Sequence, residues 1–133
     1  MVRVPEVTRL ITYVDLDEAG SDHRHLAATA RHEAVLSDDR RVPLLHDRGW
    51  GASGPPGIWA HTSVADVEAT ARTVVGPDEP DEGRTARDMA DGHWAHLAEI
   101  LRRHGVAADG PRLARLPHDV VLSDRLRARL GRG

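Results

Sequence analysis

The chain has 133 residues, a formal net charge of −3 at pH 7 and a mean hydropathy of −0.45. This length predicts one domain over residues 1–133, and the charge and hydropathy argue against nucleic acid and membrane partners. Because cysteine and lysine are both absent, disulfides, thiolate metal sites, cysteine nucleophiles and lysine-based covalent chemistry are excluded. The first residues form no long apolar stretch, so we expect neither a signal peptide nor a membrane anchor and a cytoplasmic location.

The first half of the chain carries strand patterns. Residues 7–16 are rich in β-branched side chains and end near a Gly-Ser turn signal, which predicts a strand. Residues 26–36 are ambiguous, because their alanine content favours a helix whereas the turn and the apolar segment 41–47 that follow favour a hairpin. We predict the hairpin. Pro43 cannot donate to a ladder, so the second arm is expected at an edge or a bulge.

Two helices are expected in the second half, after a loop over residues 49–57. Ser63 begins the first helix with Asp66 at the capping-box position, and Gly76–Pro77 ends it. Thr85 begins a longer helix that continues to about residue 104 and carries an apolar stripe. The acidic run at 78–82 is interpreted as a solvated linker between the two helices.

A short helix capped by Ser123 is predicted near the C-terminus, with Leu126 and Leu130 facing inward. Its arginines are expected to face water (Arg125, Arg127, Arg129 and Arg132). Strands first and helices after predict an α+β fold, with a small N-terminal antiparallel sheet of about three strands packed against two main helices and a short C-terminal helix.

The glycine-rich segment 49–57 formally matches the GxGxxG pattern of dinucleotide-binding turns. That pattern must open directly into a helix, and Pro55–Pro56 prevent a helix there. The same segment misses the GxSxG pattern by one residue, so Ser53 is not supported as a nucleophile. Neither nucleotide binding nor serine hydrolysis is therefore predicted.

Aromatic residues flank the glycine-rich segment. Trp50, Trp59 and His61 are candidates for binding a small ligand or a partner, because tryptophan supplies stacking area and often forms binding hot spots. Since the chain has no phenylalanine and only one tyrosine, the competing interpretation is that both tryptophans close a core poor in aromatics.

A histidine-based metal site is the leading alternative to a pure binding role. His93 and His96 lie three apart on the predicted long helix, a spacing that suits two ligands to a divalent metal such as zinc, with Asp119 as a candidate base. The doublets at His32 and His118 could complete such a site from elsewhere in the fold. This alternative implies a metal-dependent hydrolase.

The sequence favours a non-catalytic protein-interaction module that needs no cofactor and acts as a regulator, an immunity-type protein or an assembly partner. Arg125 and Arg129 are further candidates for partner contact, although their interleaved leucines equally predict an ordinary amphipathic helix. A homo-oligomer formed through the edge strand at Pro43 is also compatible with the pattern.

Overall fold

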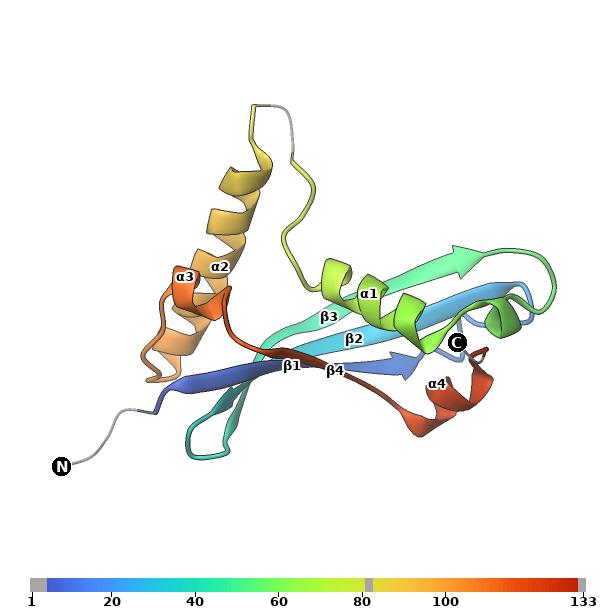
Figure 1. Ribbon diagram of the computed structural model, residues 1–133, viewed down its shortest axis with the longest axis horizontal. Coiled ribbons are helices and arrows are strands. Elements are labelled where there is room, and N and C mark those ends of the chain that lie inside the picture. Colours follow the sequence, from blue (N-terminus) through green and yellow to red (C-terminus); the bar gives the residue numbers. More distant parts are fainter. Residues whose placement is uncertain (1–4, 81–82, 132–133) are drawn as a thin grey trace.

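The computed structural model describes residues 5–80 and 83–131 (Figure 1). Along the chain, these residues form β1 (Val7–Leu16), β2 (His25–Leu36), β3 (Arg41–Ser53), the 3-10 helix η1 (Ile58–His61), α1 (Val64–Val74), α2 (Ala86–Arg103), α3 (Gly110–Leu113), β4 (His118–Leu122) and α4 (Asp124–Arg129). The predicted α+β fold class is confirmed. The sheet has a fourth strand, β4, in addition to the three that were expected.

The strands lie side by side in the order β3-β2-β1-β4. β1, β2 and β3 form an antiparallel meander, which confirms the hairpin predicted for residues 26–36. β4 returns along the other side of β1 and pairs with it in parallel. The alanines of β2 make a strand here because helix propensity is a weak preference that tertiary pairing overrides, and their small side chains let the helices pack closely.

The prediction of a loop over residues 49–57 is wrong for its first part, because β3 continues through Ser53. Gly49 pairs with Thr29 of β2, and a Cβ atom at Gly49 would stand only 2.7 Å from the carbonyl oxygen of Ala28. Gly49 is therefore required because β2 and β3 approach each other closely there, and not because the chain turns. Pro43 lies on the edge strand beside irregular pairing near His32, as predicted.

The helix ends are set by the side chains that the sequence indicated. Ser63 caps α1 and Thr85 caps α2, each in a reciprocal capping box with the aspartate three residues later. Gly105, with φ of 75°, follows the end of α2, and Ser123 caps α4. None of the described helices is long and apolar enough to cross a membrane. In the predicted acidic linker, residues 78–80 are exposed.

Two predictions of side-chain environment concern residues outside the described ranges, namely Asp81 and Glu82 in the acidic run and Arg132 in the tail. Leu126 is fully buried, as predicted for the inner side of α4, and Leu130 is partly buried.

The core forms two clusters on one face of the sheet. In the first, α2 and α3 pack on one half of the strands, with Leu10, Leu97 and Leu101 among its most buried members. In the second, α1 and α4 pack on the other half around Val14 and Leu126. Figure 1 shows α1 and α2 on this same side of the sheet. The described helices leave the opposite face of the sheet uncovered.

Candidate functional site

The face of the sheet that points away from α1 and α2 is the first candidate site, and we call it the open face. Side chains alternate along β1, so that Leu10 and Val14 enter the core while Tyr13 and Asp15 point the other way. No described helix covers this face (Figure 1). Its character is therefore set by the alternate residues of each strand.

Tyr13 lies at the centre of the open face. The register places Arg31 of β2 and Val121 of β4 directly beside it on the two neighbouring strands. The guanidinium carbons of Arg31 and Arg41 lie 5.1 Å and 5.5 Å from the centroid of the Tyr13 ring, within the range of cation–π contacts. Val121 is 41% exposed, which makes it the one exposed large hydrophobic residue among those described.

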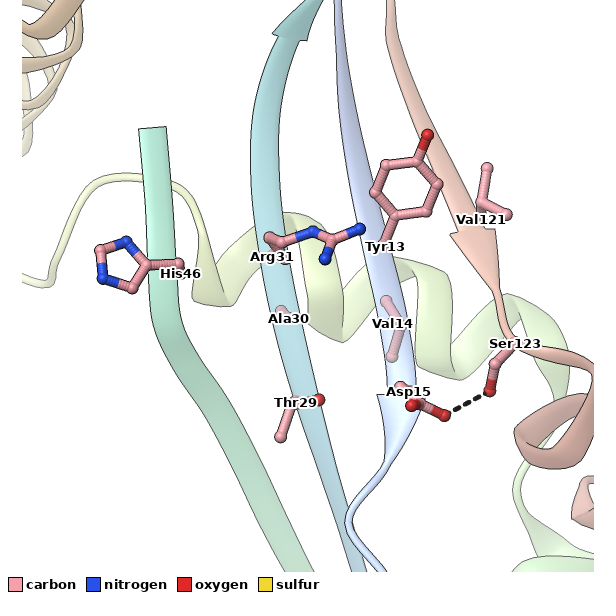
Figure 2. A pocket seen from close by; sticks show the side chains of 9 residues that line it. All are labelled: Tyr13, Val14, Asp15, Thr29, Ala30, Arg31, His46, Val121 and Ser123. Atoms are coloured by element: carbon pink, nitrogen blue, oxygen red, sulfur yellow. Dashed lines mark hydrogen bonds between the residues drawn. The ribbon is translucent and has the colours of Figure 1, made fainter. Parts of the chain in front are cut away.

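A shallow concavity of about 470 Å³ follows these residues along the sheet. Figure 2 shows it with α1 behind the strands and with Arg31 extended toward Tyr13. The concavity is lined by Tyr13, Val14, Asp15, Thr29, Ala30, Arg31, His46, Val121 and Ser123. Its lining thus combines an aromatic ring, an arginine and an exposed aliphatic side chain.

The charges on the open face are only partly compensated. Arg9 pairs with Asp119 at 2.7 Å, and Arg31 pairs with Glu33 at 3.2 Å. Arg41 forms no ion pair with any described residue, so its charge is balanced only by the ring of Tyr13 and by solvent. A guanidinium that stacks on a ring keeps its N–H edge free for acceptors.

One end of the concavity is closed by α4. Arg125 donates from Nε and Nη2 to the two carboxylate oxygens of Asp15, both at 2.8 Å, and the Ser123 hydroxyl donates to the same carboxylate at 2.7 Å. The Arg125 guanidinium, followed by the Ser123 hydroxyl, holds the pKa of Asp15 well below its usual range. These contacts fix the start of α4 against the end of β1.

Of the tryptophan candidates, Trp59 belongs to the core and Trp50 packs against it. Trp59 is 7% exposed and its indole N–H donates to the carbonyl of Asp22 at 3.0 Å, while Trp50 packs partly buried against both clusters. His61 is exposed at the end of η1. Both indoles pack largely against the core. Ligand binding by these three residues stays a prediction.

The arginine candidates of the tail make internal contacts. Arg125 holds Asp15, as described, and the guanidinium carbon of Arg129 lies 5.4 Å from the ring of Trp59. Both residues nevertheless keep exposed surface. Their role in partner contact stays a prediction.

The structure separates Asp119 from the two histidines of the metal alternative. His93 and His96 both line a second cavity, between α2 and β3, so their predicted proximity is present. Asp119 is paired with Arg9 and lies beside Ile11 on the open face, away from α2. The described residues include no group of three or more histidine, aspartate or glutamate side chains placed to hold a metal ion.

Two of the other histidines meet elsewhere, at a buried hydroxyl. Oγ1 of Thr12 lies 2.9 Å from Nδ1 of His32 and 2.6 Å from Nε2 of His118. A hydroxyl has one proton, so Thr12 donates to one imidazole and accepts from the other. His32 is 1% exposed, and this burial, reinforced by His118 and His93, lowers its pKa to about 3.

The residues of the open face were missed in the sequence. The strand at residues 7–16 was predicted, and its alternation contains the signal that Tyr13 shares a face with Arg9. The partners of Tyr13 come from β2, β3 and β4, however, and only the register brings Arg31, Arg41 and Val121 beside it.

Comparison of the chain with protein-family models, curated proteins and solved structures finds no significant match. A functional assignment therefore depends on the chemistry of the sites themselves.

Proposed function

We propose that the protein is a non-catalytic interaction module that binds an acidic segment of a protein partner on the open face of its sheet. The observation that carries this proposal is the group formed by Tyr13, Arg31, Arg41 and Val121 at the centre of an uncovered face. The role of such a module is that of a regulator, an immunity-type protein or an assembly partner.

The residue types support binding of a protein. Tyrosine and arginine are enriched among the residues that contribute most of the binding energy at protein interfaces. Such residues cluster in patches that become fully desolvated when the partner binds. Tyr13 offers rigid aromatic area, and exposed Val121 beside it gains from burial. A partner laid across β1, β2 and β4 would cover both side chains together.

The charges support an acidic partner. Arg41 has no carboxylate partner among the described residues, and the single carboxylate beside Arg31 is that of Glu33, whose residue is 9% exposed. Both guanidiniums already lie against the ring of Tyr13, so they lose less freedom when an aspartate or glutamate of the partner accepts hydrogen bonds from them.

The proposal is tested by affinity capture with matched variants. Wild-type protein, Arg41→Glu and Tyr13→Ser are immobilised, and chains captured from a lysate of the native cell are identified by mass spectrometry. Arg87→Glu on α2 provides the same charge reversal on a surface away from the open face. Circular dichroism establishes that every variant keeps the wild-type fold before capture.

The expected result is one chain captured by wild type and by Arg87→Glu and lost with Arg41→Glu and Tyr13→Ser. That chain, once purified, must bind wild type directly and expose an acidic segment that competes as a synthetic peptide. A partner captured equally by all four proteins would contradict the proposal, as would the lack of any specific partner.

A further inference from the structure

A second cavity, of about 310 Å³, lies on the helix-covered side of the sheet, between α2 and β3. Its volume is at the lower end of the range of roughly 300 to 1,000 Å³ for ligand pockets. The lining residues are Arg48, Asp78, Arg84, Asp88, Met89, Gly92, His93 and His96. This cavity takes no part in the function proposed above.

One wall of the cavity includes Gly92, a glycine in the middle of α2. A Cβ atom at Gly92 would meet nothing within 4 Å, so the position borders open space. Glycine inside a helix costs about 1 kcal/mol relative to alanine, and no packing contact at Gly92 offsets that cost. The missing side chain leaves this part of the cavity wall open to solvent.

The carboxylates of the cavity already have donors, whereas its cationic groups have capacity to spare. Asp88 accepts the backbone N–H of Thr85 at 3.0 Å in the capping box of α2. Asp78 is paired with Arg48 at 3.6 Å, and its side chain is 72% exposed. A guanidinium has five donors, so one loose contact leaves most of Arg48 available.

The pKa of His93 shows whether the positive or the negative side chains of the cavity affect this imidazole more strongly. Burial lowers the pKa of His93 most, the Arg48 charge lowers it further, and the opposing effect of Asp78 is smaller. The cation is thus felt more strongly than the carboxylate at the cavity wall.

His93 also carries a polar atom without a partner. Its Nε2 is enclosed by protein and makes no hydrogen bond within the described part of the chain. The ring has a T-shaped contact with Trp94, with centroids 4.9 Å apart, but an aromatic edge does not replace a hydrogen-bond partner. Buried polar groups are nearly always paired in native proteins, and Nε2 of His93 is the one buried polar side-chain atom in the described part of the chain that lacks a partner.

We propose that this cavity binds a tetrahedral oxyanion, either free phosphate or a phosphate monoester, with Arg48 and Arg84 as charged donors and His93 and His96 as imidazole donors. Arginine suits this chemistry because its planar fork matches two oxygens of a phosphate group. The ester remains an option because the volume exceeds what the anion alone requires.

The test is a titration with inorganic phosphate, and separately with glycerol phosphate, at physiological ionic strength. Binding is followed by isothermal calorimetry and by the Cε1–H resonances of His93 and His96. We expect saturable binding, with shifts confined to these imidazoles, and about tenfold weaker affinity in Arg48→Gln, because one charge-assisted contact is removed. If glycerol phosphate binds more tightly than inorganic phosphate, the rest of the cavity accommodates the organic group of an ester. If the two bind equally, the ligand is free phosphate.

Two variants separate a specific site from general attraction of anions. Arg87→Gln removes a charge from the same helix outside the cavity and should leave the affinity unchanged. Gly92→Leu keeps every charge, places a side chain in the open space and should abolish binding, so it tests the cavity even where Arg48→Gln fails to fold. The proposal is overturned by unsaturable binding, by equal weakening in Arg87→Gln, or by full affinity in Gly92→Leu.

Discussion

Oγ1 of Thr12 and Nδ1 of His32 lie 2.9 Å apart on neighbouring central strands, and neither residue has appreciable contact with solvent. On β1, Thr12 stands between Leu10 of one hydrophobic cluster and Val14 of the other. A polar, titratable group therefore occupies the join between the two halves of the core. Its burial makes the stability of the fold depend on the neutral form of His32.

The first prediction concerns pH. The folded-state pKa of His32, about 3, is below its unfolded value of 6.5, so the unfolded chain binds more protons between these values. The contribution is fully present above pH 6.5 and is lost as pH falls toward 3, at about 1.4 kcal/mol per pH unit. Lowered pKa values of His93 and His118 act in the same direction.

Urea unfolding followed by tryptophan fluorescence measures this dependence. In His32→Leu, the slope of the free energy of unfolding against pH should become shallower by about 1.4 kcal/mol per unit over the same interval. An unchanged slope would mean that His32 titrates alike in the folded and the unfolded chain.

The second prediction concerns the hydroxyl itself. Thr12→Val keeps the shape of the side chain but leaves the buried ring of His32 and that of His118 without their shared partner. We expect the free energy of unfolding to fall by about 1 to 3 kcal/mol. Thr29→Val, the same change on the open face, should alter it by less than about 0.5 kcal/mol. Equal effects in chemical denaturation would show that the buried hydrogen bonds contribute nothing.

The third prediction concerns the glycines of β3. Gly49→Ala places a Cβ atom 2.7 Å from the carbonyl oxygen of Ala28, so the two strands must move apart, at a cost of about 1 to 3 kcal/mol. At Gly51 the nearest atom would be 3.5 Å away, an ordinary contact. Gly51→Ala should therefore leave the midpoint of thermal unfolding nearly unchanged, and a comparable loss in both variants would contradict the described register.

Local signals made much of the fold predictable. The capping boxes at Ser63 and Thr85 are patterns of four residues, so the sequence itself indicated where α1 and α2 begin. The path of residues 49–53 was not predictable in this way. Glycine usually signals a turn, and only pairing with β2 reveals that close approach of two strands is what requires it at Gly49.

Contacts between distant segments were beyond the sequence. Pairing of β4 with β1 joins residues more than a hundred positions apart, and nothing in segment 118–122 specifies that neighbour. The open face shares this limit, because Tyr13 meets Arg31 and Val121 only through the register of three strands. The closeness of His93 and His96 was predictable, since both lie on one helix.

The fourth prediction concerns the attachment of α4. Arg125→Gln removes the bidentate contact with Asp15, so we expect faster hydrogen exchange at the amides of α4 and a lower midpoint of thermal unfolding. Arg127→Gln, a neighbouring exposed position with no ion pair to a described residue, is the control. If both variants exchange alike, the Asp15 contact does not hold α4 in place.

The central claim, binding of an acidic partner on the open face, is tested most directly by cross-linking from within that face. A photoreactive benzoylphenylalanine replaces exposed Val121 in one variant and Arg87 of α2 in another, and both are irradiated in the native cell. We predict that the variant with the photoreactive residue at position 121 cross-links to one chain, through a segment rich in aspartate or glutamate. The variant at position 87 should not cross-link to that chain. Cross-links that are equal at the two positions, or none at position 121, would contradict the claim.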